Sequence, residues 1–372
     1  MKCAYHEDAR CRSCTELPRP YAEQLAAKQA SAEAALAPFA PRQWLPPKAS
    51  AESGFRNKAK MAIGGSVDAP TLGLIDPAGL GVDLAACPLY PATMQAAFEP
   101  IRAALAAARV PPYDLAQRRG EGKYVLLTEA PGTGELLLRF VLRSREPMER
   151  LQRQLPALQQ ALPALRVVSV NLLSEHKAVT EGDTEILLTA ESEVRCRLND
   201  VDFRLTPRSF LQTNSAIAAA LYRQAREWID AAAPASVWDL YCGVGGFALH
   251  AARAGRTVVG IESTPEAIAA ARAAGPGGQW IAADATAWAR AQQQAADCVI
   301  VNPPRRGIGA ELAGWLNASG AGTLIYCSCN IESLRRDLAA LPAYRLEHAQ
   351  VFDMFPHSTH YETLVLLTRR LP

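Results

Sequence analysis

The glycine-rich segment DLYCGVGGF occupies residues 239–247. It continues the apolar run of residues 235–240, which reads as a β-strand. The glycines that follow let the backbone turn sharply and approach a ligand closely. Glu262 ends the next apolar run, 19 residues after Gly243. A carboxylate at that point can accept hydrogen bonds from both ribose hydroxyls of an adenosine, so the stretch predicts an adenosine-binding turn between a strand and a helix.

Two ligand classes fit this turn. The spacing Gly243-x-Gly245-x-x-Ala248 satisfies a loose dinucleotide pattern, so a nicotinamide-dependent dehydrogenase is one alternative. Two other features favour a methyl donor, S-adenosylmethionine. Asp239 lies near the strand end, where a carboxylate could meet the donor's ammonium group, and Asn302-Pro303-Pro304-Arg305 follows a later strand, where methyltransferases place substrate-facing groups.

The rest of the chain predicts the strands and helices that surround this turn. After residue 200, strands alternate with helices, which predicts a doubly wound parallel sheet with ligands at the carboxyl ends of its strands. We expect strands at residues 235–240, 258–261, 297–301, 323–326 and 363–367. Before residue 200 the pattern predicts strands at 123–127, 135–142 and 167–171, and helices at 21–39 and 147–162. We therefore predict an α/β protein with a cysteine-rich segment (1–90), a smaller α+β central domain (48–200) and a class I, Rossmann-like domain (201–372).

Length, charge and composition limit the number of domains, the possible partners and the location of the protein. The 372 residues suffice for two domains, and the net charge is only +2, which permits a nucleic-acid partner that docks on a local patch. The first residues lack the apolar core of a signal peptide, and no apolar run approaches the roughly 20 residues that span a bilayer. We expect a cytoplasmic protein without membrane contact. Its nine cysteines then read as ligands, catalytic groups or core residues.

Three cysteines, Cys3, Cys11 and Cys14, lie in one short irregular segment, and Cys87 stands further along. Four thiolates can bind zinc or an iron–sulfur cluster, and the spacing does not choose between them. His6 could replace one thiolate.

Two more cysteines, Cys327 and Cys329, stand at the carboxyl end of the strand predicted at residues 323–326, where side chains face the ligand crevice. A thiolate that adds to carbon 6 of uracil makes carbon 5 nucleophilic toward a methyl group, and a base must then remove the carbon 5 proton. Position alone does not separate the two cysteines, because residues two apart share a face of a strand. Glu362, with His357 and His360, could be a metal site, a base with its helpers or a polar loop.

Taken together, these ordered motifs resemble the bacterial uracil-C5 RNA methyltransferases, and within them the shorter branch that modifies 23S ribosomal RNA at uridine 747. The resemblance covers essentially the whole chain. Its motifs are the four cysteines at 3, 11, 14 and 87, GFRNKAKM at 54–61, SFLQTN at 209–214, the glycine turn, NPPRRG at 302–307, SCN at 328–330 and FPHSTHYE at 355–362.

The resemblance implies a role for each motif. Cys3, Cys11, Cys14 and Cys87 would hold a [4Fe–4S] cluster. S-adenosylmethionine would be bound by Gln212, Tyr241, Gly243, Glu262 and Asn302. Cys329 would be the nucleophile and Glu362 the base. Tyr241 and Asn302 replace a phenylalanine and an aspartate that many relatives carry at these positions.

The RNA partner would be 23S ribosomal RNA, bound by a monomer without protein partners. Two basic strips, Arg56, Lys58 and Lys60, and Arg118, Arg119 and Lys123, are candidate phosphate contacts. Other functions remain open at this point. They are C5-methylation of another ribosomal or transfer RNA uridine, methylation of an exocyclic amine, the nicotinamide dehydrogenase, and a non-catalytic metal-containing RNA-binding protein.

Overall fold

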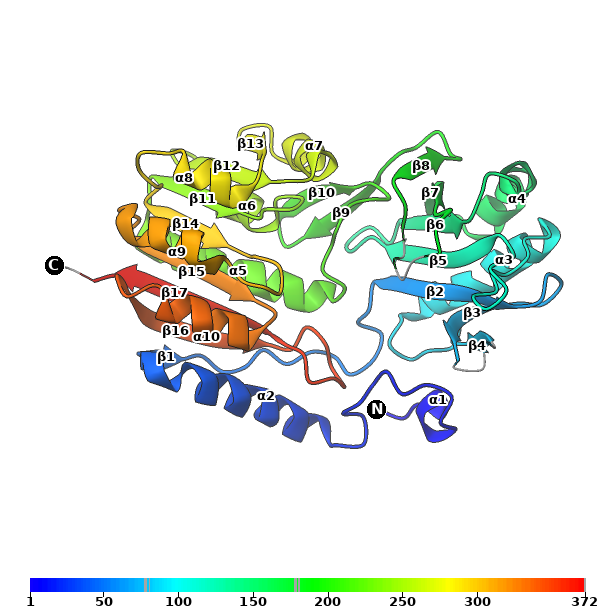
Figure 1. Cartoon of the computed structure of the whole chain (residues 1–372), viewed down its shortest axis with the longest axis horizontal. Coiled ribbons are helices and arrows are strands. Elements are labelled where there is room, and N and C mark those ends of the chain that lie inside the picture. The colour runs from blue at the N-terminus through cyan, green and yellow to red at the C-terminus, as the bar shows by residue number, and fades with distance from the viewer. Residues whose placement is uncertain (77–78, 80, 177–178, 180, 371–372) are drawn as a thin grey trace. The chain divides into compact units, whose positions relative to one another are not determined.

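The chain folds as two compact units, seen in a computed structural model that describes residues 1–76, 79, 81–176, 179 and 181–370 (Figure 1). The first unit comprises residues 1–12, 53–197 and 204–207, and the second comprises residues 13–52, 198–203 and 208–372. Residues 13–52 thus belong to the second unit although they precede the whole sheet of the first in sequence.

The first unit is built on a seven-stranded sheet of order β4-β3-β2-β5-β6-β7-β8. Neighbouring strands are antiparallel except β6 and β7, which run parallel across the connection that contains helix α4. Helices α3 and α4 pack their apolar faces, including Phe98, Ile101 and Leu155, on one side of the sheet. The elements are α1 (Ala4–Glu7), β2 (Lys58–Gly65), β3 (Pro70–Ile75), β4 (Gly81–Asp83), α3 (Ala92–Ala107), β5 (Gly122–Glu129), β6 (Leu136–Leu142), α4 (Met148–Ala161), β7 (Leu165–Leu172) and β8 (Thr184–Leu187).

The second unit is built on an eight-stranded sheet of order β1-β16-β17-β15-β14-β11-β12-β13. Strands β13, β12, β11, β14 and β15 run parallel, which confirms the predicted Rossmann-like half of the chain. The strands of this sheet are β1 (Gln43–Trp44), β11 (Ser236–Leu240), β12 (Thr257–Glu262), β13 (Gln279–Ala282), β14 (Cys298–Val301), β15 (Thr323–Ser328), β16 (Tyr344–Phe352) and β17 (Glu362–Arg369). Outside both sheets, β9 (Val194–Leu198) pairs with β10 (Val201–Leu205), and residues 194–197 and 204–205 of this pair count with the first unit.

The sheet is mixed rather than wholly parallel, which corrects the prediction. Strand β17 lies antiparallel between β15 and β16. Strands β16 and β17 are consecutive and are joined by the loop of residues 353–361, which is too short for the crossover that parallel strands need. Phe352, the last residue of β16, pairs with Glu362, the first of β17, so this loop closes a β-hairpin.

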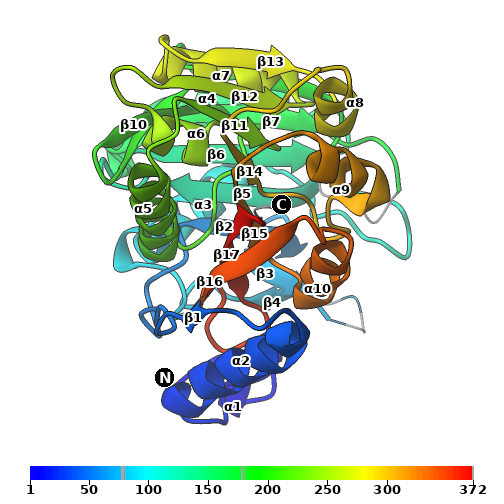
Figure 2. The same cartoon turned by 90° about the vertical axis from the view of Figure 1, so that its left-hand side faces the viewer.

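Helices cover both faces of this sheet, as a doubly wound fold requires (Figure 2). One face carries α5 (Ser215–Ala232), α6 (Gly246–Ala251) and α7 (Pro265–Ala274); the other carries α8 (Ala285–Arg290), α9 (Gly309–Ala318) and α10 (Ile331–Ala339). Helix α2 (Tyr21–Leu36), followed by the short turn η1 (Ala37–Phe39), packs against α10 and confirms the helix predicted at 21–39. Within the described residues, no helix is long and apolar enough to cross a membrane.

Candidate active site

The second unit contains a cavity of about 610 Å³ at the carboxyl ends of its parallel strands. Seven residues that the sequence singled out line it: Gln212, Tyr241, Gly243, Glu262, Asn302, Cys329 and Glu362. They come from segments that are far apart in sequence, and the sheet topology brings them together because β11, β12, β14 and β15 end at one edge.

The glycine turn lines one side of this cavity. Gly243 and Gly245 both have positive φ, at 55° and 89°, so the turn needs residues without a Cβ. Gly246, at the start of α6, lies so close to Tyr222 that a Cβ there would meet its hydroxyl oxygen at 2.5 Å. The chain therefore packs this helix start against the Tyr222 ring and leaves the backbone of Gly243 exposed to a ligand.

Glu262 ends β12 beside the turn, as predicted. Its Oε2 accepts a hydrogen bond from the Gly243 amide at 3.3 Å. Its Oε1 accepts from the Ser263 hydroxyl at 2.9 Å and the Thr264 amide at 3.0 Å. These bonds fix the carboxylate at the cavity wall, in the place where a Rossmann-like fold binds a ribose diol.

Asp239 does not lie where it could meet the ammonium group of a methyl donor, contrary to what the sequence suggested. Its carboxyl group is fully buried and is not among the groups that line the cavity. Its Oδ2 accepts from the Ala248 amide at 2.9 Å, while its Oδ1 has no hydrogen-bond partner within the described part of the chain. Burial raises its pKa to about 8. Asp239 therefore anchors the first turn of α6 from behind the glycine turn.

Sequence reasoning missed a third acidic residue of the cavity, Asp284, beside Glu262 and Glu362. It caps α8 by accepting a hydrogen bond from the Ala287 amide at 2.8 Å. The available signal was an Asp before an alanine-rich helical run, a common N-cap. An N-cap alone does not indicate a ligand site. Because the short edge strand β13, which ends just before Asp284, was not predicted, the sequence did not place Asp284 at the cavity.

The two cysteines near the end of β15 lie in different surroundings. Cys327 is within the strand and fully buried. Cys329 lies beyond the strand end, is half-buried and lines the cavity. Burial and the Glu362 carboxylate raise the pKa of the Cys329 thiol, and the Arg305 guanidinium lowers it. Arg305 is thus the cationic neighbour that the sequence did not reveal; Asn330, which caps α10, donates to its backbone oxygen at 3.0 Å.

Glu362 is 3 % exposed, and burial raises its pKa to about 7. Its Oε2 accepts a hydrogen bond from the Cys327 thiol at 3.7 Å. A carboxyl group with such a pKa is poised to exchange a proton near neutral pH. Glu362 and Cys329 both line the cavity.

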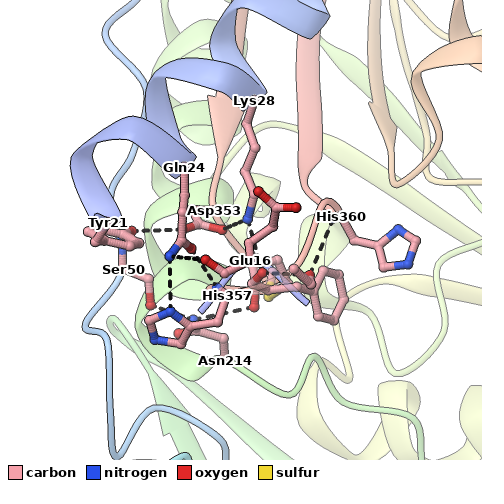
Figure 3. Close-up of polar contacts among 12 residues, drawn as sticks. Glu16, Tyr21, Gln24, Lys28, Ser50, Asn214, Asp353, His357 and His360 are labelled. Carbon is pink, nitrogen blue, oxygen red and sulfur yellow. Dashed lines mark hydrogen bonds and ion pairs between the residues drawn. The ribbon is translucent and has the colours of Figure 1, made fainter. Parts of the chain in front are cut away.

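His357 and His360, in the loop of residues 353–361, do not line the cavity with Glu362. His357 is fully buried, and its Nε2 bonds the backbone oxygen of Glu52 at 2.7 Å. His360 lies on the other side of the loop, with its Nδ1 3.5 Å from Arg305 (Figure 3). Among the described residues, no group of three or more His, Cys, Asp or Glu side chains is arranged to hold a metal ion.

The N-terminal cysteines are distributed over both units. Cys3, Cys11 and Cys87 belong to the first unit and Cys14 to the second. Burial raises the pKa of the Cys87 thiol, and the nearby Cys3 and Cys11 thiols raise it further. In the part of the chain that the structure describes, these cysteines do not form a group of three or more that is arranged to hold a metal ion.

Comparison with known proteins gives the reaction class. Residues 289–370 match the family model described as tRNA (Uracil-5-)-methyltransferase, and residues 237–316 match one described as Methyltransferase domain. The chain is 46 % identical to the 23S rRNA (uracil(747)-C(5))-methyltransferase RlmC of Escherichia coli over 99 % of this chain and 100 % of that protein. It is 47 % identical to the Serratia proteamaculans enzyme of the same name, with the same coverage.

A solved structure agrees. The Pyrococcus abyssi tRNA (uracil-54, C5)-methyltransferase in complex with S-adenosyl-L-homocysteine superposes with a TM-score of 0.81 and 27 % identity, covering 95 % of this chain and 85 % of that one. The glycine turn and the carboxylate that ends β12 fit both ligand classes, and the two methyltransferase family models decide for a methyltransferase over the dehydrogenase. The chain therefore belongs to the family of the 23S rRNA (uracil(747)-C(5))-methyltransferases.

Proposed function

We propose that this protein transfers a methyl group from S-adenosylmethionine to carbon 5 of a uridine in 23S ribosomal RNA, uridine 747 as in the named relatives. The observation that carries the proposal is a single cavity lined by the proposed cofactor-binding residues and by both proposed reactive groups, Cys329 and Glu362. The structural likeness to a tRNA uracil-54 enzyme makes another ribosomal or transfer RNA uridine the second candidate.

The cavity suits S-adenosylmethionine, since about 610 Å³ is in the usual range for a cofactor site. Glu262 would accept hydrogen bonds from the ribose hydroxyls, and the bare backbone at Gly243 would allow close approach. Gln212, Tyr241 and Asn302 would complete the contacts. When bound, S-adenosylmethionine supplies an electrophilic methyl group on a positively charged sulfur.

Cys329 would supply the nucleophile. Its thiolate adds to carbon 6 of the uracil, forming a carbon–sulfur bond and an enolate across carbons 5 and 4. Carbon 5 of the enolate then bonds to the methyl carbon as the bond between that carbon and the cofactor's sulfur breaks, which would leave S-adenosylhomocysteine. The guanidinium of Arg305 favours the thiolate, because it lowers the thiol's pKa against the effect of burial. Cys327 is assigned no chemical step, since it is fully buried.

Glu362 would complete the reaction as the base. Its carboxylate removes the proton from carbon 5, the electrons re-form the carbon 5–carbon 6 double bond, and the thiolate of Cys329 leaves. The products are 5-methyluridine and S-adenosylhomocysteine, and the enzyme is regenerated when the Glu362 carboxyl group gives its proton to solvent. The hydrogen bond from Cys327 would hold one carboxylate oxygen in place and leave the other for the proton.

The [4Fe–4S] cluster is part of the proposal. Cysteine thiolates are the ligands that such clusters require, and Cys3, Cys11, Cys14 and Cys87 supply four of them. These three and Cys14 would hold the cluster. A bound cluster would tie the N-terminal residues to the segment around Cys87. As an enzyme of ribosomal RNA, the protein would work in the cytoplasm, and we expect a monomer.

Mapping the methylated nucleotide tests the proposed function. Purified protein is incubated with labelled S-adenosylmethionine and 23S ribosomal RNA that lacks the modification. Label at uridine 747 alone is expected. Label at another uridine would support the second candidate, and label on an exocyclic amine or on no nucleotide would refute C5-methylation. In a parallel thermal melt, S-adenosylmethionine should stabilise the protein and NAD should not.

A further inference from the structure

Helix α2 contacts the loop that leads to Glu362 through one face (Figure 3). Its contact residues stand at positions 21, 24, 28 and 31, so they share one side of the helix. Tyr21 donates from its hydroxyl to Asp353 Oδ2 at 2.7 Å. Lys28 donates to Asp353 Oδ1 at 2.6 Å and to the Phe355 backbone oxygen at 3.0 Å. The hydroxyl of Tyr361 donates to Ser31 Oγ at 3.0 Å.

Gln24 holds the middle of the same loop. Its Oε1 accepts from the His357 amide at 3.0 Å, and its Nε2 lies 3.4 Å from His357 Nδ1. A backbone oxygen can only accept, so His357 Nε2 must carry the proton in its bond to Glu52. Gln24 Nε2 donates to the backbone oxygens of Glu16 at 3.0 Å and Arg19 at 2.8 Å, so the bond from the His357 amide is the firmer contact between Gln24 and the loop. His357 adopts a positive φ of 63°, which is uncommon for a residue with a side chain, and these contacts hold it there.

The polarity of this face is unusual. Lys28 is 4 % exposed, Asp353 is 0 % exposed and Gln24 is equally buried. A buried ion pair generally gives a fold no more stability than apolar side chains of similar volume would. The Lys28–Asp353 pair and Gln24 do what apolar residues cannot, because they fix particular backbone atoms of the loop.

The loop connects these anchors to the reactive group. It joins β16 to β17, its residue Phe355 lines the cavity, and Tyr361 directly precedes Glu362. A loop held at residues 353, 355, 357 and 361 leaves Glu362 little freedom to move away from the substrate side of the cavity.

We propose that Lys28 and Gln24 are positioning residues for Glu362, acting through the loop of residues 353–361. The inference rests on the proposed function, in which Glu362 resolves the covalent Cys329–uracil complex. Proton removal requires the carboxylate at one defined carbon atom, whereas the earlier steps depend on Cys329 and the cofactor. Loosening the loop should therefore slow resolution of the complex more than its formation.

The main variant is the double substitution Lys28→Met and Asp353→Asn. Removing both charges avoids leaving a lone buried ion, and the side-chain amide introduced by Asp353→Asn can still accept from Tyr21. Gln24→Met is the second variant, because it keeps the ion pair and removes the contacts to His357, together with the bonds from Gln24 to the Glu16 and Arg19 backbone oxygens. Glu33→Gln, an exposed change on the same helix, is the matched control. Each protein is tested for its melting temperature, its turnover and KM with S-adenosylmethionine and unmodified RNA, and covalent protein–RNA complex on a denaturing gel.

We expect both variants to turn over about 10- to 100-fold more slowly, with KM for S-adenosylmethionine unchanged and the covalent complex accumulating. The control should match the wild type. Wild-type turnover, a loss that only follows the folded fraction without accumulation of complex, or failure of both variants to fold would overturn the proposal. Absence of any complex between the wild type and 5-fluorouridine RNA would instead refute the proposed function itself.

Discussion

At the scale of single residues, Cys327 and Cys329 lie in different surroundings although only one residue separates them. Strand alternation left Cys327 and Cys329 equivalent, since residues two apart share a face. Strand β15 ends at Ser328, so alternation no longer applies to Cys329, which lies outside the strand at the cavity wall. The sequence pattern identified the right segment, but the residue at which a strand ends is set by tertiary packing that a local pattern does not contain.

The pH dependence of turnover reports on Glu362. Its pKa of about 7 means that acid below neutrality keeps the carboxyl group protonated and unable to accept the carbon 5 proton. We expect the rate at which the covalent complex resolves to fall by about tenfold per pH unit below that value. Glu362→Gln should lower this rate by about 10²- to 10⁴-fold and trap the complex.

The measurement is a single-turnover time course on denaturing gels between about pH 5.5 and 8.5, bracketing that value as general-base catalysis requires. Glu332→Gln, an exposed carboxylate change at the start of α10, serves as the control and should keep the wild-type profile. If the covalent complex resolves at the wild-type rate in Glu362→Gln, another group must be the base.

At the scale of elements, the parallel strands were foreseeable and the edges of the sheet were not. Strands β11, β12, β14 and β15 are continuous apolar runs, which is how buried parallel strands read. Strand β16 buries Glu347 and Gln350, so it looks polar in sequence, and β13 has only four residues. Missing β16 concealed the hairpin, and with it the antiparallel setting of β17 that delivers Glu362.

The close packing of α6 at its first residue gives a prediction for cofactor binding. In Gly246→Ala, the new Cβ would overlap the Tyr222 ring, so either the ring or the glycine turn must shift. We expect S-adenosylmethionine to bind at least about tenfold more weakly, in line with overpacking costs of about 1–3 kcal/mol. Isothermal titration calorimetry measures this.

Gly314→Ala on α9 is the matched control, because a Cβ there meets open space. It should leave cofactor affinity unchanged and stabilise the protein slightly, by up to about 1 kcal/mol. Equal affinities for Gly246→Ala and the wild type would show that the Gly246–Tyr222 contact does not set the shape of the cofactor site.

At the scale of the whole molecule, the sequence predicts two basic strips as phosphate contacts, and the structure shows that their members differ in exposure. Lys123 is buried, and its ammonium donates to the Glu175 backbone oxygen at 2.6 Å, so it is not an exposed phosphate contact. Arg118, Arg119 and Lys60 are exposed, as expected of RNA contacts. Local charge spacing shows which residues are cationic, but their exposure depends on the loops that cover the sheet.

The proposed cluster predicts the metal content of the chain. Anaerobically purified protein should be brown and contain about four irons per chain. Replacing Cys87 with serine should lower the iron content and the melting temperature, because removing one ligand opens the site. The core substitution Cys298→Ala, the control, should keep the iron. Colourless protein with stoichiometric zinc would contradict the iron–sulfur assignment.

RNA docking should depend on the exposed pair Arg118 and Arg119. Replacing both with serine should weaken binding of 23S ribosomal RNA fragments and reduce the slope of log K against log salt concentration by about 1–2. Filter binding at several salt concentrations measures the slope. Arg153→Ser, an exposed change on α4, is the control, and an unchanged slope in the double variant would exclude the pair from the RNA contact.

A denaturing gel shows whether Cys329 forms the covalent complex with uracil. RNA with 5-fluorouridine at the target position is incubated with S-adenosylmethionine and with wild type, Cys329→Ala or Cys327→Ala. Fluorine cannot leave carbon 5 as a cation, so wild type and Cys327→Ala should give a shifted protein–RNA band and Cys329→Ala none. A shifted band with Cys329→Ala, or no band with the wild type, would contradict the account.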